Sequence, residues 1–263
     1  MNQYETEKRL CWVYSLLATL LGVSVICVAI PYNHWRETLD VCPGSWLENT
    51  NCGCIFYGVS TSQYFNGGRD PYCLYAIFAP LPILVYALVM AVFHMYRVCI
   101  NNIGKYESEK STTVEEIEGE SIIVTSRARV AAQSDAVIFC WIPNASIAAV
   151  FALYNLLHAA IMTDGFLKTC HQYRGYLVRQ LRATGDHATA IHFRLSCQSI
   201  FDFMDYIQRD APNVRRGDFI NSGIALQIAL FTSWFAVFLW IVVSVYTSMR
   251  AYKEREVLTC CGN

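Results

Sequence analysis

The sequence predicts an all-α membrane protein, a four-helix transmembrane bundle with two disulfide-stapled extracellular loops. Three observations support this fold class. Hydrophobic residues make up 54% of the 263 residues, whereas charged residues make up only 16%. Four apolar runs contain no charged residue, and each reaches the roughly 20 residues that a helix needs to cross ~30 Å of hydrocarbon. Of the twelve cysteines, five lie in the segments that connect these runs on one side, and a sixth, Cys73, begins the second run.

The same composition excludes several classes of protein. A net charge of −1 leaves no basic footprint for nucleic acid. The apolar and aromatic content is too high for a disordered chain, and the length is too great for a small disulfide-rich toxin. Membrane lipids are therefore the expected surroundings, and no nucleic-acid partner is expected.

The order of elements follows from the positions of the apolar runs. The first run follows Lys8 and Arg9, as the core of a signal peptide would, but its length exceeds the usual 7–15 or so residues, and Val28–Pro31 lacks a small-x-small cleavage site. We therefore expect it to be retained. The predicted segments are a cytoplasmic N-terminus (1–9), a first span (10–30), extracellular loop 1 (31–72), a second span (73–96), a cytoplasmic loop (97–135), a third span (136–162), extracellular loop 2 (163–220), a fourth span (221–249) and a cytoplasmic C-terminus (250–263).

Cysteines orient the chain better than charge does. Positive residues divide evenly between the two sides, and only the smaller weight of long loops favours cytoplasmic termini. Disulfides persist outside the cytosol, so the side with an even number of cysteines is expected to be extracellular. The disulfide candidates are Cys42, Cys52, Cys54, Cys73, Cys170 and Cys197. Cysteines close to the inner ends of spans suit palmitoylation, and the candidates are Cys99, Cys260 and Cys261.

The two outer loops differ in kind. Loop 1 is punctuated by glycine, asparagine and proline, which predicts a small stapled β-turn structure, and its four cysteines leave three pairings open. A metal site at Cys52-Gly-Cys54 is not expected, because no Cys/His pair stands at the matching spacing. The sequence of loop 2 has the periodicity of helices over 173–182 and 188–210, separated by Gly185-Asp186.

A Cys170–Cys197 bridge would pin this helical hairpin to the membrane end of the third span, and two separate buried thiols are the alternative. The amphipathic helix over 188–210 has three possible partners: its own loop, a lipid surface or another protein.

The spans contain no Asp, Glu, Lys or Arg, which argues against a pump or a coupled transporter. Small residues at four-residue spacing predict close helix packing: Ala18 and Gly22 in the first span, and Ala225, Ala229 and Ser233 in the fourth. The intramembrane polar residues, expected to hydrogen bond between helices, are Asn144, Asn155, His158 and Gln227. Prolines 80, 82 and 143 predict kinks, and Trp234 and Trp240 are expected to pack in the core.

The segment over 97–135 is acidic and rich in serine and threonine, which predicts a solvated linker, with phosphorylation or adaptor binding as the alternative. The sequence contains no Gly-x-Ser-x-Gly, P-loop or His-Glu-x-x-His motif. We therefore expect neither an enzyme nor a resident cofactor or metal.

Three stretches carry a resemblance to a known family: Cys52-Gly-Cys54-Ile-Phe-Tyr57-Gly58, Met162-Thr-Asp-Gly165-Phe166-Leu-Lys-Thr-Cys170, and the fourth span with its tail from Ala225 to Tyr252. In these stretches and in its topology, the chain resembles the tetraspan family of the insect pasiflora and fire exit proteins and the vertebrate transmembrane protein 179. The claudin signature Gly-Leu-Trp-x-x-Cys is absent.

The resemblance implies a structural role in septate junctions, the occluding contacts that maintain the paracellular barrier of invertebrate epithelia and barrier glia. It implies a plasma-membrane location at lateral junctions and other junctional membrane proteins as partners, with self-association into a homo-oligomer left open. An auxiliary subunit of a channel or receptor is the alternative, because such subunits are also charge-free four-span proteins with stapled outer loops. A pore-forming protein is the third hypothesis for its function.

Overall fold

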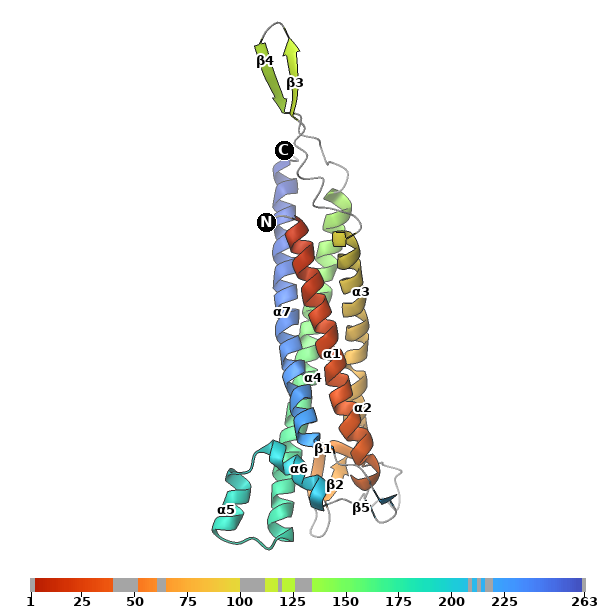
Figure 1. Cartoon of the computed structure of the whole chain (residues 1–263), viewed down its shortest axis with the longest axis vertical. Helices are drawn as coiled ribbons and strands as arrows, with labels where there is room; N and C mark the ends of the chain where they lie inside the picture. Colours follow the sequence, from red (N-terminus) through yellow and green to blue (C-terminus); the bar gives the residue numbers. More distant parts are fainter. Residues whose placement is uncertain are drawn as a thin grey trace. The chain divides into compact units, whose positions relative to one another are not determined.

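The structure is a computed structural model. It describes residues 3–39, 52–60, 65–99, 112–117, 120–125, 134–207, 210–211, 214–215 and 220–261. The elements, in chain order (Figure 1), are α1 (Gln3–Leu39), β1 (Cys54–Ser60), β2 (Phe65–Gly68), α2 (Asp70–Phe78), α3 (Pro80–Cys99), β3 (Thr112–Ile117), β4 (Glu120–Thr125), α4 (Ser134–Gln180), α5 (Asp186–Phe193), α6 (Cys197–Ile207), β5 (Asp210–Ala211), β6 (Val214–Arg215) and α7 (Ser222–Cys261).

Among the described residues, four helical segments are long and apolar enough to cross a membrane: Glu5–Arg36, Asp70–Cys99, Trp141–Gln180 and Ser222–Tyr252. The predicted number of apolar helices of membrane-crossing length is therefore confirmed. Their hydropathy explains why these helices form, because a backbone in hydrocarbon must satisfy its hydrogen bonds within its own segment.

The chain divides into two compact units. We call Met1–Leu17, Tyr86–Phe151 and Leu239–Asn263 the terminal unit, and Ala18–Val85 and Ala152–Phe238 the stapled unit. Helices α1, α4 and α7 each contribute to both units, as does the α2–α3 segment. The two units are described separately below.

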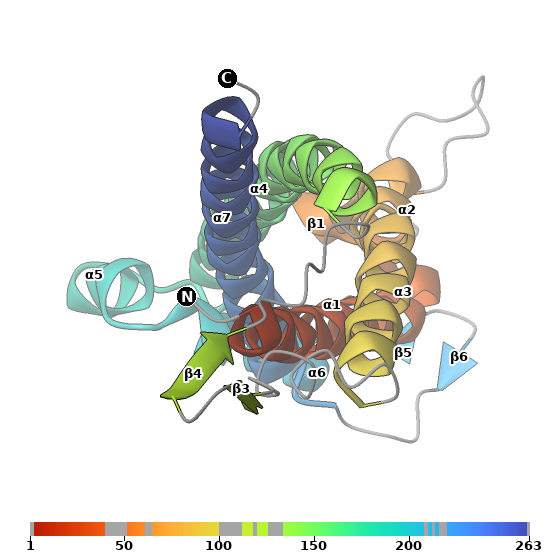
Figure 2. The same cartoon turned by 90° about the horizontal axis from the view of Figure 1, so that it is seen from above.

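Aromatic side chains form the core of the terminal unit. The ring of Tyr14 stacks on that of His94 at 5.4 Å and meets the edge of Trp240 at 6.0 Å. Phe151 lies 5.0 Å from Tyr86 and 5.2 Å from Trp240. These contacts join α1, α3, α4 and α7, whose segments in this unit follow one another around a common centre (Figure 2). Trp240 is fully buried, in the core position that the sequence predicts.

The core of the stapled unit combines long helices with a β-hairpin. Strands β1 and β2 pair antiparallel, with Cys54 opposite Gly68 and Ser60 opposite Phe65. Phe65 inserts against Tyr173 of α4 at 4.9 Å, edge to face. Loop 1 therefore contains the β structure expected from its glycine and asparagine content, and this hairpin lies on α4.

Two helices run further than the sequence predicts. Helix α1 continues past Pro31 to Leu39, beyond the expected end of the first span at residue 30. Helix α4 continues past Met162 to Gln180, so the helix expected over 173–182 is the last part of α4 rather than a separate element. The expected boundaries follow the charge-free runs, but a helix that leaves hydrocarbon has no reason to end where charged residues begin.

Loop 2 contains a helix break that was not predicted. The single helix expected over 188–210 is two helices, α5 and α6. The amides of Arg194 and Leu195 both donate to the carbonyl of Ala190, which closes α5. The Ser196 hydroxyl accepts a hydrogen bond from the amide of Ser199 at 3.1 Å, the geometry of an N-cap, and α6 begins there.

The acidic segment over 97–135 is not wholly a linker. Strands β3 and β4 pair antiparallel, with Thr112 opposite Thr125 and Ile117 opposite Glu120. The β-branched run at Ile122, Ile123 and Val124 explains the pairing, since such residues favour strands. The prediction of a solvated linker overlooked this run.

The prolines act in different ways. The kink expected at Pro80 is a break, with α2 ending at Phe78 and α3 beginning at Pro80. Pro31 and Pro143 lie inside α1 and α4, and both helices continue past them.

Candidate contact surface

Two disulfides fasten loop 1 and loop 2 of the stapled unit to its helices. Cys54 at the start of β1 is joined to Cys73 of α2. Cys170 of α4 is joined to Cys197 at the start of α6. The sulfur-bearing residues Cys54, Cys73 and Cys170 are almost completely buried. Loop 1 and loop 2 are therefore each tied covalently to a helix next to them.

The other cysteines of interest have different environments. Cys52 is also disulfide-bonded, and Cys42 lies outside the described residues. Cys99 is free and exposed at the end of α3, which leaves it accessible to acylation. Cys260 and Cys261 end α7, and the environment of their side chains lies outside the described part of the chain.

The first and second resemblance stretches meet on α4. The Tyr57 hydroxyl donates to the carbonyl of Ile161 at 3.1 Å, and the amide of Gly58 donates to Thr169 Oγ1 at 2.9 Å. Gly165 provides the room for this contact, since a Cβ there would lie 2.8 Å from a ring carbon of Tyr57. Tyr57 adopts φ 59°, a left-handed conformation that is strained for a tyrosine. The packing against α4 holds it there.

Charged groups surround the Tyr57 ring. Lys168 Nζ lies 5.1 Å from the ring centroid and forms an ion pair with Asp164 at 2.9 Å. The ring of Tyr72 lies 4.4 Å away. Burial, followed by the hydrogen bonding and negative charge of Asp164, raises the pKa of Tyr57 to about 12. The tyrosine is thus a neutral hydrogen-bond donor at physiological pH.

The third resemblance stretch joins the same region through α7. Trp234 Nε1 donates to Thr163 Oγ1 at 3.0 Å, so Trp234 is 42% exposed and bonded at one edge rather than buried in the core as expected. Ser233 Oγ lies 2.9 Å from Ser24 Oγ of α1 and donates to Met162 Sδ at 3.9 Å. All three stretches therefore contribute to one contact network on α4.

The predicted helix-packing residues divide into two groups. Ala18, Ala229 and Ser233 are buried, and the carbonyl of Ala229 accepts a hydrogen bond from Ser24 at 3.4 Å. Ala225 is half-buried, and a Cβ at Gly22 would meet nothing within 4 Å. The four-residue spacing therefore locates a close approach of α1 and α7 at Ala229 and Ser233, while Gly22 makes no close contact.

The predicted intramembrane polar residues also divide. In the terminal unit, Asn144 Oδ1 accepts hydrogen bonds from the hydroxyls of Tyr14 at 3.3 Å and Tyr86 at 2.6 Å. In the stapled unit, His158 Nε2 donates to the carbonyl of Ala76 at 3.0 Å, and Asn155 is buried. Gln227 is exposed on α7, so the inward position expected for it is wrong.

A buried ionic cluster in the terminal unit joins His94, a polar residue near one end of the second apolar run, to Glu7 and Arg97, which the sequence does not indicate as its partners. Glu7 Oε2 accepts a hydrogen bond from His94 Nδ1 at 2.5 Å, and Glu7 Oε1 lies 2.7 Å from Arg97 Nη1. Glu7 is 1% exposed. We name these three residues the Glu7 cluster. The only sequence signal is that His94 and Arg97 stand three apart on one helical face.

Within the described residues, no three His, Cys, Asp or Glu side chains gather as metal ligands would. Comparison of the chain with family models, with curated proteins and with solved structures finds no match. The resemblance to the pasiflora and transmembrane protein 179 family thus stays a hypothesis that is based on the three stretches and on topology.

Proposed function

We propose that this chain is a structural tetraspan component of septate, occluding cell junctions. In this proposal it supports assembly of the paracellular barrier in epithelia and barrier glia through lateral contacts and contacts of its extracellular loops. The observation that carries the proposal is the double covalent fastening of the stapled unit. Disulfides Cys54–Cys73 and Cys170–Cys197 hold both loops on helices, which suits a pre-organised binding surface, because rigid loops lose less entropy on association.

The proposed topology has the four apolar helices as one transmembrane bundle in the plasma membrane. The disulfides favour an oxidising compartment for the stapled loops, so both termini and the β3–β4 hairpin would be cytoplasmic. Free, exposed Cys99 belongs to the cytoplasmic side in this orientation.

Exposed apolar side chains support the membrane assignment and lateral contacts. Phe231, Phe235 and Phe238 form a stacked row along α7, with centroids 6.1 and 6.2 Å apart. Phe231 is 70% exposed, which in water would be a large uncovered apolar patch. Lipid chains, other junctional membrane proteins or a second copy of the chain would cover this row.

The roles found for the polar side chains favour a structural protein over an enzyme. In the described part of the chain, the buried asparagine Asn144, the histidine His158 and the stapled-unit hydroxyl of Ser24 each bond to another helix. These groups are therefore engaged in packing, which is the role that a scaffold requires.

Barrier permeability tests this function. Depletion of the protein in an epithelium is expected to let a dextran tracer cross between cells and to disperse junction markers. Re-expression of the unaltered chain should restore the barrier. The matched variants are Cys170→Ser, expected to fail, and Cys99→Ser, expected to succeed.

An intact barrier with normal marker distribution after depletion would overturn the proposal. Purification in mild detergent separates it from the alternative, an auxiliary subunit. Recovery of a stoichiometric channel or receptor without junction proteins would favour that alternative.

A further inference from the structure

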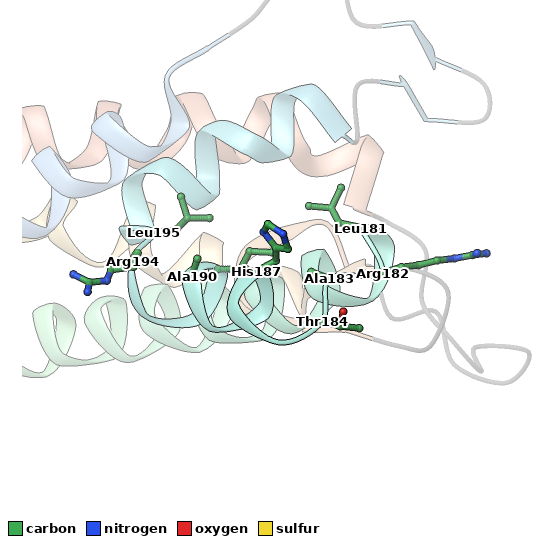
Figure 3. A pocket seen from close by; sticks show the side chains of 9 residues that line it. Leu181, Arg182, Ala183, Thr184, His187, Ala190, Arg194 and Leu195 are labelled. Carbon is green, nitrogen blue, oxygen red and sulfur yellow. The ribbon is translucent and has the colours of Figure 1, made fainter.

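A cavity of about 480 Å³ lies in the stapled unit, between the end of α4 and the helix α5 (Figure 3). Its volume is within the range of roughly 300–1,000 Å³ that is typical of ligand sites. None of the contacts described above uses it. Six of its lining residues matter here: apolar Leu181, Ile191 and Leu195, and basic or titratable Arg182, His187 and Arg194.

The cavity favours a negatively charged occupant. No carboxylate is among its lining residues, and Asp186 in the first turn of α5 is not part of the lining. Helix α5 begins beside the cavity, where its N-cap residue Gly185 provides no side-chain hydrogen bond. The two guanidinium groups near the cavity attract carboxylates.

The layout of the cavity favours an extended occupant. Figure 3 shows Arg182 at one end and Arg194 at the other, with both side chains pointing away from the cavity in opposite directions, while Leu181, His187 and Leu195 lie between them. An occupant that extends past both ends of the cavity would meet a guanidinium group at each end and apolar side chains between them. A lipid has one headgroup and its tails on one side of it, whereas an extended peptide can place an apolar side chain between two carboxylates.

The position of the cavity along α4 also argues against lipid from the surrounding membrane as its occupant. Asp164 and Lys168 form an exposed ion pair on α4, and each side chain is more than half exposed. Such a pair belongs outside hydrocarbon. Helix α4 continues for 12 residues from Lys168 to Gln180, which adds about 18 Å at 1.5 Å per residue.

Exposed apolar side chains flank the cavity. Phe193 of α5 is 80% exposed and Leu181 is 61% exposed. Arginines and aromatic residues around an apolar centre are typical of protein interfaces.

We propose that this cavity binds an extended acidic segment of a partner protein, with an apolar side chain between two carboxylates. This inference rests on the proposed function for the extracellular position of the cavity and the identity of the partner as a junctional protein. The binding chemistry itself depends only on the lining residues.

The test measures peptide binding to the full chain in nanodiscs of phosphatidylcholine. The probe is a short synthetic peptide with a central Phe flanked by Glu and Asp. We expect a Kd on the order of 10–100 µM, which weakens as salt is added. Two further peptides, one with Lys in place of every acidic residue and one with Ser in place of the Phe, are expected to bind at least about tenfold more weakly.

Matched variants locate the site. The double variant Arg182→Glu with Arg194→Glu is expected to weaken binding about tenfold or more. Arg69→Glu makes the same kind of charge change at an exposed residue of the stapled unit outside the cavity, and should leave binding unchanged. Ala190→Trp fills the cavity without changing charge and should also abolish binding, whereas Ala188→Trp, on the same helix but outside the lining, should not.

Three results would overturn the proposal: no binding of the acidic peptide at about 1 mM, equal binding by the arginine variants and Arg69→Glu, or displacement of the peptide by phosphatidylserine vesicles or by a second copy of the chain. Melting of each variant shows whether it is folded. Suppose that the peptide binds in a way that depends on both arginines, while depletion of the protein leaves the barrier intact. That pair of results would support the site and reject the junctional function. The reverse outcome would reject the site alone.

Discussion

The terminal unit contains a buried ionic cluster, whereas the stapled unit contains buried disulfides. In the terminal unit, Glu7 is bonded to His94 and Arg97 with 1% of its surface exposed. In the stapled unit, Cys54–Cys73 and Cys170–Cys197 connect loops to helices. The two units are thus reinforced by different chemistry. The difference matches the proposed topology, because disulfides persist in oxidising surroundings and ion pairs do not depend on redox conditions.

The largest expected effect is the loss of the Cys170–Cys197 disulfide. Its sequence separation is 27 residues, and the loop-entropy relation gives about 3–4 kcal/mol for a loop of this length. We expect Cys170→Ser to lower the free energy of unfolding by this amount, measured by thermal unfolding in mild detergent. A reducing agent should lower the stability of the unaltered chain in the same direction.

The control for this prediction is Cys99→Ser, at a free and exposed cysteine, which should leave stability unchanged. Mass spectrometry of unreduced peptides checks the pairing directly. Detection of both Cys170 and Cys197 as free thiols would contradict the claim that a disulfide between them stabilises the stapled unit.

The next largest effect is expected at the Glu7 cluster. Removal of one partner from a fully buried ion pair costs about 3–5 kcal/mol. Arg97 keeps 16% of its side chain exposed, so solvent screening reduces the expected cost of Glu7→Gln to about 2–3 kcal/mol. Thermal unfolding with and without reducing agent separates this effect from that of the disulfides, since the loss should persist after reduction.

Glu5→Gln is the matched control, because Glu5 lies in the first turn of α1, two residues before Glu7, and belongs to no ion pair among the described residues. Equal stability losses in the two variants would show that charge at the helix start, rather than the buried cluster, holds the terminal unit.

A smaller effect is expected where β1 packs on α4. A Cβ at Gly165 would lie 2.8 Å from Tyr57 and 3.0 Å from Phe56, whereas one at Gly175 would meet nothing within 4 Å. Overpacking costs about 1–3 kcal/mol, and alanine regains up to about 1 kcal/mol in helix propensity. We therefore expect Gly165→Ala to lose about 1 kcal/mol and Gly175→Ala to gain about 0.5–1 kcal/mol. If thermal unfolding shows that both variants change the free energy of unfolding in the same direction, Tyr57 does not pack tightly on α4.

The smallest effect concerns the hydrogen bond from Tyr57. Tyr57→Phe removes its bond to the carbonyl of Ile161, worth about 0.5–1.5 kcal/mol. The pKa of Tyr57 is raised to about 12, above the ordinary value near 10. The folded state therefore favours the neutral phenol. The contribution of the neutral Tyr57 phenol to the free energy of unfolding is fully present below about pH 10 and is lost as the pH rises towards 12.

Unfolding of the parent chain and of Tyr57→Phe at a series of alkaline pH values checks this sign. The stability difference between the two proteins should shrink across that interval. A difference that grows instead would mean that the ionised tyrosine is preferred in the folded state.

Features of this fold can be predicted from the sequence when the signal for them is local. Four charge-free apolar runs specify four helices of membrane-crossing length, because hydropathy is a property of a short window. Helix ends were predicted less accurately, since α4 continues 18 residues beyond Met162, where Phe166, Cys170 and Tyr173 are buried in the core of the stapled unit. The break between α5 and α6 requires recognising Ser196 as an N-cap, and the run around Ile123 that pairs in the β3–β4 hairpin lay within a segment dominated by glutamates.

The amino-acid order alone was sufficient for the four apolar helices and for the charge-free runs that they contain. Only the tertiary structure decided that Cys54 pairs with Cys73, that Glu7 meets His94 at a separation of 87 residues and that Tyr57 bonds to Ile161 at a separation of 104 residues. It also decided that Gly22 and Gln227 lie apart from close helix contacts. The reason is physical: hydropathy acts along a segment, whereas these pairings depend on the facing directions of helices that are distant in the sequence.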